Sequence, residues 1–167
     1  SQFGCSIRYV HEEKPLGTGG ALGLLPDDLP DLPLVMMNGD VLTRVNLEHL
    51  LEDHKHKGGV ATMCVKQHQY QIPYGVIKEQ NGTVIGVEEK PTQTYFINAG
   101  IYILEPKLIK TVKKNEVIDM PPLLMKKVEE GQKVNIFPVH EYWLDIGKMV
   151  DFNQAQKDVM LGGRFGG

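Results

Sequence analysis

An aspartate at the end of an apolar segment is the residue of this sequence best suited to bind a metal ion. Residues 34–37 are Leu-Val-Met-Met, and Asn38, Gly39 and Asp40 follow them. A short apolar run bounded by turn residues is typical of a strand buried on both faces of a parallel sheet. Such sheets bind ligands at the carboxyl ends of their strands. Mg²⁺ binds one or two carboxylates and leaves its other positions to water and phosphate. Asp40 is therefore a candidate magnesium ligand, and Gly39 leaves space beside it.

A second candidate is the glycine-rich segment Gly17-Thr18-Gly19-Gly20, which leads into a helix predicted over residues 18–25. The amino ends of helices offer free N–H groups to anions. Two familiar phosphate loops do not match: no Gly-Lys-Ser/Thr sequence follows, and Leu22 stands where a dinucleotide loop requires glycine. A plain turn remains the alternative interpretation both here and for Asn38-Gly39-Asp40, since Gly, Asn and Asp are common turn formers.

Further polar and glycine groups stand at predicted strand ends. Asn98-Ala99-Gly100 interrupts an apolar segment, and small residues inside a strand indicate close approach by another backbone or a ligand. Asn98 should have a hydrogen-bond partner there, because a buried unpaired amide is costly. The whole set is Gly17 to Gly20, Asp40, Tyr74-Gly75, Glu89-Lys90, Asn98 to Gly100 and Asp145. On one sheet edge, these groups would suit Mg²⁺, phosphates and a sugar better than hydride or acyl transfer. Glu89-Lys90 can also be interpreted simply as a solvated strand end.

Strands and helices interleave along the chain. The patterns predict strands over residues 6–10, 34–40, 60–65, 74–77, 83–87, 95–104 and 133–138, and helices over 18–25, 47–57, 106–113, 120–130 and 148–160. Asn46 can cap the helix over 47–57, Gly58 ends it, and Asn81-Gly82 is a strong hairpin turn. The predicted fold class is α/β, with a mainly parallel sheet that carries an antiparallel hairpin.

Some local expectations concern residues that could be mistaken for ligands. His54 and His56 are interpreted as helix surface or boundary residues, because neither has a second ligand at a suitable spacing. Asp119 is expected to cap the helix over 120–130. Residues 67–73 are expected to form a polar loop. The residues expected on the buried side of the helix over 47–57 are Leu47, Leu50, Leu51 and His54.

Size and composition exclude several classes of protein. The chain has 167 residues, of which 41% are hydrophobic and 23% charged, as in a globular domain with a real core. A net charge of −3 gives no reason to expect a nucleic-acid or membrane surface. Cys5 and Cys64 have no metal-site spacing, and a reduced cytoplasmic setting is the simplest account. The first residue is Ser and the tail over 161–167 is glycine-rich and expected to be flexible, so a piece of a longer protein is expected.

The order of these motifs resembles that of the sugar-1-phosphate nucleotidyltransferases (NDP-sugar pyrophosphorylases), and within them the mannose-1-phosphate guanylyltransferase-like group. The likeness spans roughly Ile7 to Phe152. It rests on Pro15-Leu16-Gly17-Thr18-Gly19-Gly20-Ala21, Asn38-Gly39-Asp40, Tyr74-Gly75-Val76, Glu89-Lys90-Pro91, Asn98-Ala99-Gly100-Ile101-Tyr102 and Trp143-Leu144-Asp145-Ile146-Gly147.

The resemblance implies a Rossmann-like fold and a reaction in which a sugar-1-phosphate oxygen attacks the α-phosphate of a nucleoside triphosphate and displaces pyrophosphate. It implies catalytic roles for Asp40, Lys90 and Asp145, with both aspartates on Mg²⁺ and Lys90 on the sugar phosphate. Alignment and charge neutralisation supply most of such catalysis. The resemblance implies that Gly17 and Thr18 bind the nucleotide. The other implied substrate-binding residues are Gly39, Tyr74, Gly75, Glu89, Asn98 and Gly100.

One departure from the family pattern is serious. The family begins with a strand and a loop, Gly-Gly-x-Gly-Thr-Arg-Leu, that binds the triphosphate, and these 167 residues contain no such segment. Residues 1–160 are therefore expected to be a partial nucleotidyltransferase domain, inactive alone, followed by the tail over 161–167. Its sheet is expected to expose an edge that invites pairing with another copy. Some family members also carry nucleotide-sensing CBS domains.

Three other functions remain as alternatives. The first is a regulatory module that senses sugar nucleotides without turnover, although such a sensor has no need of both Asp40 and Asp145. The second is a glycosyltransferase of the related fold, which usually shows Asp-x-Asp where this chain has Asn38-Gly39-Asp40. The third, a dehydrogenase, is disfavoured because the dinucleotide pattern fails. The sequence names neither base nor sugar; guanine and a mannose-like or amino sugar are favoured by the resemblance alone.

Overall fold

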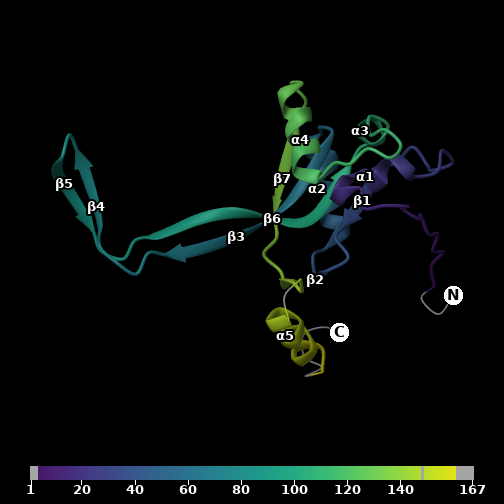
Figure 1. Cartoon of the computed structure of the whole chain (residues 1–167). Coiled ribbons are helices and arrows are strands. Elements are labelled where there is room, and N and C mark those ends of the chain that lie inside the picture. Colours follow the sequence, from purple (N-terminus) through teal and green to yellow (C-terminus); the bar gives the residue numbers. More distant parts are fainter. Residues whose placement is uncertain (1–3, 148, 161–167) are drawn as a thin grey trace.

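A four-stranded sheet forms the centre of the molecule. The computed structural model describes residues 4–147 and 149–160. The sheet has the order β1-β6-β3-β7 (Figure 1). Its strands are β1 (Leu34–Met37), β3 (Ala61–Gln71), β6 (Thr92–Leu104) and β7 (Val134–Pro138). β1, β3 and β7 run in one direction, and β6 runs opposite to them. The α/β class is thus confirmed, and the expected parallel character holds for strand direction; because β6 lies between β1 and β3, the pairs that it forms are antiparallel.

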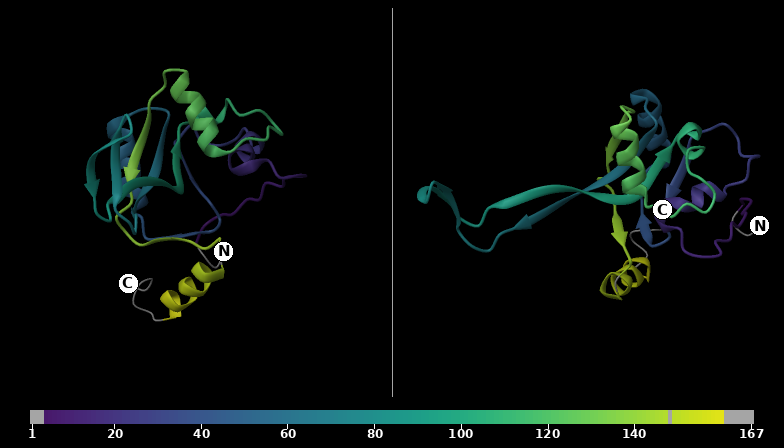
Figure 2. Two further views of the ribbon diagram at one scale, coloured as in Figure 1. Left: turned by 60° about the vertical axis from the view of Figure 1, so that its left-hand side comes forward. Right: turned by 45° about the horizontal axis from the view of Figure 1, so that its top comes forward.

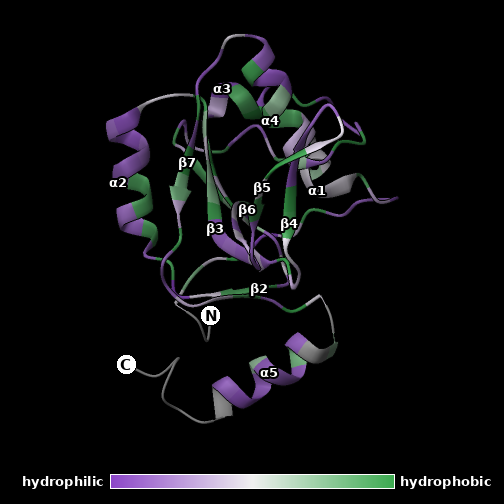
Figure 3. Ribbon diagram, turned by 90° about the vertical axis from the view of Figure 1, so that its left-hand side faces the viewer, coloured by the Kyte–Doolittle hydropathy of each residue, from purple (hydrophilic) through white to green (hydrophobic). Residues whose placement is uncertain are grey.

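Helices cover both faces of this sheet (Figures 1 and 3). They are α1 (Gly17–Gly20) continued by a 3₁₀ turn (Ala21–Leu24), α2 (Leu47–Lys57), α3 (Pro106–Ile109) and α4 (Met120–Glu129). A fifth helix, α5 (Met149–Met160), lies apart from the sheet (Figure 3). β6 alternates between two hydrophobic clusters: Tyr102 and Leu104 pack with α3 and α4, whereas Ile101 and Ile103 pack with α2. This period of two is what a strand buried on both faces requires.

β3 and β6 continue beyond the sheet as a two-stranded arm (Figures 1 and 2). The hairpin of β4 (Val76–Gln80) and β5 (Thr83–Glu88) lies at its far end. Asn81 and Gly82 have φ angles of 51° and 78°, as the expected tight turn requires, so the predicted hairpin is confirmed. The predicted loop over residues 67–73 is wrong, because β6 pairs with β3 as far as Gln71.

A small ribbon joins two distant parts of the chain below the sheet. β2 (Val41–Thr43) pairs antiparallel with β8 (Trp143–Asp145). Arg44 N donates to Tyr142 O at 3.0 Å and extends this pairing by one step. The ribbon places the start of β2 beside the end of β8, which positions the candidate metal ligands described below.

The segment over residues 6–10 differs from the prediction. It forms no strand, and Tyr9 is 90% exposed. An alternating pattern becomes a strand only where a neighbouring strand takes its backbone hydrogen bonds, and no strand in the described part of the chain does so. The helix predicted over 106–113 is also shorter, since α3 ends at Ile109. The tail over 161–167 lies outside the described residues.

α2 begins and ends where its sequence signals predict. Asn46 Oδ1 accepts a hydrogen bond from His49 N at 3.0 Å, and Gly58 ends the helix with a φ of 65°. Leu50 and His54 are buried as expected, but Leu47 is 43% exposed. His54 is not a surface residue: its Nδ1 lies 2.7 Å from Thr62 Oγ1, and its Nε2 lies 3.0 Å from Glu105 Oε1.

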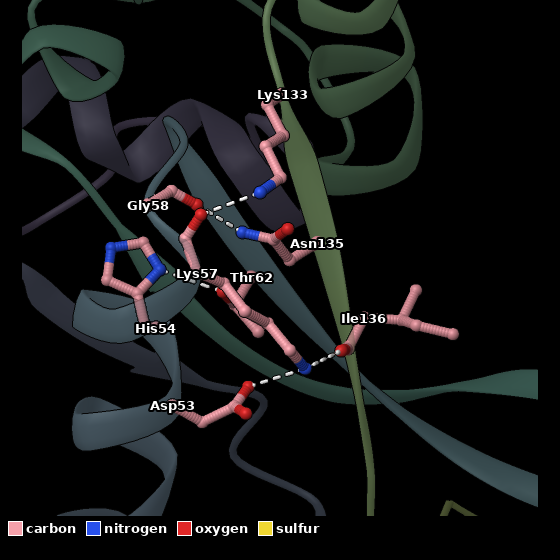
Figure 4. Close-up of polar contacts among 8 residues, drawn as sticks. All are labelled: Asp53, His54, Lys57, Gly58, Thr62, Lys133, Asn135 and Ile136. Carbon is pink, nitrogen blue, oxygen red and sulfur yellow. Dashed lines mark hydrogen bonds and ion pairs between the residues drawn. The ribbon is translucent and has the colours of Figure 1, made fainter.

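Two side chains, one directly before β7 and one within it, bind the carboxyl end of α2 (Figure 4). Lys133 Nζ donates to Lys57 O at 2.6 Å, and Asn135 Nδ2 donates to Gly58 O. Lys57 Nζ in turn lies 2.8 Å from Asp53 Oδ2. These bonds satisfy backbone carbonyls that the helix itself leaves unpaired. No helix in the described residues is long and apolar enough to span a membrane.

Candidate active site

Asp40 and Asp145 lie together at one end of the β2–β8 ribbon. Val41 is the register partner of Asp145, and Ile146 N donates to Asp40 O at 2.9 Å. A Cβ placed on Gly147 would lie 3.0 Å from Asp145 Oδ1 and 3.6 Å from Asp40 Oδ2. The two carboxylate oxygens are therefore separated by no more than the sum of these distances, and both face the space beside Gly147.

The donors at this point fit a hard divalent cation. Within residues 4–147 and 149–160, no group of three or more histidine, cysteine or acidic side chains surrounds a common point. Asp40 and Asp145 thus offer two carboxylates and leave the remaining positions open. Mg²⁺ binds in this way where one or two carboxylates hold it and substrate phosphates complete its shell.

A cleft of about 500 Å³ lies beside Asp40. Its lining residues are Thr18, Met36, Met37, Asn38, Gly39 and Asp40. A Cβ on Gly39 would meet nothing within 4 Å, so this glycine leaves open space rather than fitting a tight contact. The cleft brings the glycine-rich segment and the Asn38-Gly39-Asp40 motif to one place, as the predicted shared edge requires.

The glycine-rich segment packs tightly on the backbone before α4. Gly17 has a φ of +77°, and a Cβ on it would lie 2.7 Å from Ile118 O. A Cβ on Gly20 would meet Glu116 O. Two of these glycines are therefore required by close approach of backbone, and the plain-turn interpretation does not account for them.

Asn98-Ala99-Gly100 connects three strands near the cleft. Asn38 N donates to Gly100 O at 2.9 Å, and Trp143 Nε1 donates to Ala99 O at 2.8 Å. Asn98 Nδ2 donates to Tyr102 OH at 2.6 Å, which confirms that this amide has a partner. Burial raises the pKa of Tyr102, and the bond from Asn98 opposes that rise. The segment therefore ties β6 to the strands that carry the two aspartates.

Four predicted site residues lie elsewhere. Tyr74 and Gly75 directly precede β4, and Glu89 and Lys90 directly follow β5. Lys90 N donates to Tyr74 O at 3.3 Å, and Glu89 Oε2 lies 3.0 Å from a Cβ placed on Gly75. They form one group, at the junction between the arm and its hairpin, far from β1 and β2 (Figures 1 and 2). The expectation of one shared edge is therefore wrong for these four, because the strands that carry them leave the sheet.

Asp119 has a different role from the one predicted. Its side chain makes no capping bond to α4; its Oδ1 instead accepts hydrogen bonds from Thr18 N at 2.9 Å and Thr18 Oγ1 at 3.2 Å. The sequence also did not predict the hydrogen bond from Trp143 Nε1 to Ala99 O. Neither contact has a local signal, because each joins segments more than forty residues apart.

Comparison with known proteins identifies relatives of the chain. A family model described as nucleotidyl transferase matches residues 1–161. The chain is 32% identical over 157 residues to the mannose-1-phosphate guanylyltransferase catalytic subunit beta of Dictyostelium discoideum, covering 90% of this chain and 43% of that protein. It is 34% identical over 163 residues to the mannose-1-phosphate guanyltransferase of Pichia angusta, again covering 90% and 43%. The chain thus spans less than half the length of these relatives.

Solved structures share the fold. A Bacillus anthracis protein assigned as a glucose-1-phosphate thymidylyltransferase, in complex with sucrose, superposes with a TM-score of 0.68 at 22% identity, covering 93% of this chain and 66% of the other. HddC from Yersinia pseudotuberculosis, complexed with GMP-PN, superposes with a TM-score of 0.63 at 22% identity, covering 89% and 64%.

Proposed function

The chain belongs to the nucleotidyl transferase family, and from that premise we propose that it is part of an enzyme that makes an NDP-sugar. In this proposal the chain provides the side chains that bind the metal ion and the sugar-1-phosphate. In the proposed reaction, an oxygen of a sugar-1-phosphate attacks the α-phosphorus of a nucleoside triphosphate. The bond between the α-phosphorus and the bridging oxygen breaks, and pyrophosphate leaves with that oxygen. The attacking oxygen is already ionised, so the reaction needs no histidine base.

The convergence of Asp40 and Asp145 is the observation that carries this proposal. Two carboxylates from strands more than one hundred residues apart face the same space at the edge of a cleft. Asp40 and Asp145 would hold Mg²⁺, which neutralises phosphate charge when it is bound. Thr18 lines the side of the cleft that would receive the base and ribose, and Gly17 precedes it in the chain.

The arm carries the proposed sugar-phosphate contacts. Glu89 would accept hydrogen bonds from sugar hydroxyls, Gly75 would let the ring approach the backbone, and Lys90 would pair with the phosphate. One sugar-1-phosphate can contact these residues and the metal only if the arm bends toward the cleft. An unpacked two-stranded ribbon is marginally stable by itself, so such a bend costs little packing.

Guanine and mannose are the proposed base and sugar, because two of the relatives at 32–34% identity are named mannose-1-phosphate guanyl(yl)transferases. The metal in this proposal is Mg²⁺ and the setting is cytoplasmic. The 167 residues contain no Gly-Gly-x-Gly-Thr-Arg-Leu loop, so slow turnover or none is expected from this chain alone.

Pyrophosphate release tests the proposal. The chain is assayed with Mg²⁺, each of the common nucleoside triphosphates and a panel of sugar-1-phosphates, alone and joined to a family glycine loop. The expected result is release by the joined protein, fastest with GTP and mannose-1-phosphate, and little release by the chain alone. Rapid turnover by the chain alone would show that the loop is dispensable and that the assigned roles are wrong. Tight Mg²⁺-dependent nucleotide binding without any turnover in the joined protein would favour a sensor instead.

A further inference from the structure

Asp119 lies outside the aspartate pair, immediately before α4, yet it binds the wall of the cleft. Its Oδ1 accepts hydrogen bonds from Thr18 N at 2.9 Å and from Thr18 Oγ1 at 3.2 Å. Met120 N in turn donates to Thr18 Oγ1 at 2.9 Å. Thr18 therefore supplies the capping oxygen of α4 from another part of the chain, and Asp119 fixes the backbone of Thr18.

Backbone hydrogen bonds complete this connection. Gly19 N donates to Ile118 O at 2.9 Å, and Ile118 N donates to Leu16 O at 2.9 Å. We call residues 16–19 together with residues 118–120 the clasp. A Cβ on Gly17 would lie 2.7 Å from Ile118 O and 2.8 Å from Asp119 Oδ1. The clasp thus has no space for a side chain at residue 17, and the loop lies directly against Ile118 and Asp119.

The clasp acts on the cleft because Thr18 belongs to both. Thr18 lines the same cleft as Asn38, Gly39 and Asp40. α1 is only four residues long, and a helix of that length does not hold its own shape. The loop therefore depends on contacts with the segment before α4, and Asp119 is its side-chain anchor there.

We propose that Asp119 is a positioning residue for nucleotide binding: it does not touch the nucleotide, but it sets the distance between the Thr18 wall of the cleft and Asp40. This inference rests on the proposed function. It predicts that Asp119 controls affinity for the nucleoside triphosphate and leaves the sugar-phosphate group on the arm unaffected.

Isothermal titration calorimetry with Mg²⁺ and GTP tests the inference on the chain joined to the glycine loop, in four forms: wild type, Asp119→Ala, Asp119→Asn and Asn46→Ala. Asp119→Ala is expected to weaken GTP binding at least tenfold. Asp119→Asn keeps an oxygen that can accept from Thr18 N, so its affinity is expected to stay within about threefold of wild type. Asn46→Ala removes the cap of α2 on the other face of the sheet and is the matched control: it is expected to lower the Tm without changing GTP affinity.

Each outcome decides the matter. Unchanged GTP affinity in Asp119→Ala, or an equal loss in Asn46→Ala, would overturn the inference while the proposed function stands. No GTP binding by wild type would overturn both. If Asp119→Ala does not fold, Asp119→Glu takes its place: it keeps the charge but moves the oxygens by one methylene, and it too is expected to weaken GTP binding at least tenfold.

Discussion

Asp40 and Asp145 differ in how their side chains are held. Asp145 Oδ1 accepts a hydrogen bond from Gly147 N at 2.9 Å, which fixes the orientation of that carboxylate. Within the described residues, no hydrogen bond holds the carboxylate of Asp40. If the two aspartates hold a cation as proposed, Asp145 would be a preformed ligand, and Asp40 would be free to adjust when the cation binds between them.

Replacing either aspartate by asparagine keeps the size of the side chain and removes its charge. Each of Asp40→Asn and Asp145→Asn is expected to lower the rate of pyrophosphate release by at least about 100-fold, the size of effect typical when one group that stabilises transition-state charge is lost. Steady-state kinetics of the protein joined to a glycine loop measure this. Because both residues are exposed, the Tm should change little. A loss of rate accompanied by a large fall in Tm would indicate a structural role instead.

The raised pKa of Cys64 leads to a prediction of how the free energy of unfolding depends on pH. Burial raises the pKa of its thiol from 9.0 to about 12, so the folded protein keeps a proton that the unfolded chain loses above pH 9. This contribution to stability is fully present below pH 9 and is lost as the pH rises toward 12, at about 1.4 kcal/mol per pH unit. Urea unfolding at pH 8, 9 and 10 measures the slope. Cys64→Ala should show a shallower fall above pH 9, and an unchanged slope would contradict this assignment.

At the scale of elements, the sequence predicts what local signals determine. α2 occupies residues 47–57 as expected, because Asn46 and Gly58 are adjacent signals that need no partner from elsewhere. The β4–β5 hairpin follows for the same reason from Asn81 and Gly82. The length of β3 and the direction of β6 could not be read locally, because each depends on which distant strand lies beside it.

The candidate site likewise has a part that the sequence predicts and a part that it does not. The motifs correctly brought Asp40 and Asp145 together, and Asn38 and Trp143 from the same two motifs bond to residues 99 and 100, since each motif closes or interrupts a strand of the sheet or its ribbon. They did not reveal that Glu89 and Lys90 stand on an arm, because residue pattern carries no information on where a ribbon points. Asp119 was missed because its bond to Thr18 joins residues 101 positions apart.

Asn135 links β7 to the carboxyl end of α2 and gives a prediction about an element. Its Nδ2 donates to Gly58 O (Figure 4), and the residue is buried. Asn135→Ala leaves that carbonyl without its donor, so the free energy of unfolding is expected to fall by about 1–3 kcal/mol. Urea denaturation measures it. Glu129→Ala, on the exposed side of α4, should change stability by less than about 0.5 kcal/mol; equal effects would show that the Asn135 bond is not important.

At the scale of the whole molecule, the arm is the unusual feature. Several of its large side chains are exposed: Tyr70 and Phe96, for example, are 56% and 59% exposed. The arm also separates the β4–β5 hairpin, which Glu89 and Lys90 directly follow, from the β2–β8 ribbon (Figure 2). A reaction that uses both groups on one substrate requires them to meet, so the extended arm is expected to be the state without substrate.

A distance measurement tests whether the arm closes. In the protein joined to the glycine loop, spin labels at Glu79→Cys, in the hairpin at the end of the arm, and at Lys114→Cys on the core report the separation, in a Cys5→Ser background. Cys64 can remain, because it is fully buried and its thiol has a pKa of about 12. Adding Mg²⁺, GTP and mannose-1-phosphate should shorten the distance, whereas a Lys55→Cys and Lys114→Cys pair within the core should not change. Full turnover with no shortening would contradict closure of the arm.

The central claim is that Asp40 and Asp145 hold one divalent cation together. Titration of Mn²⁺, used in place of Mg²⁺, into the protein joined to the glycine loop, followed by electron paramagnetic resonance in the presence of GTP, tests it most directly. The account predicts one Mn²⁺ site in wild type, at least tenfold weaker binding in Asp40→Asn and in Asp145→Asn, and no change in the control Asp31→Asn, an exposed aspartate on the loop before β1. Equal Mn²⁺ affinity in wild type and both aspartate variants would contradict it.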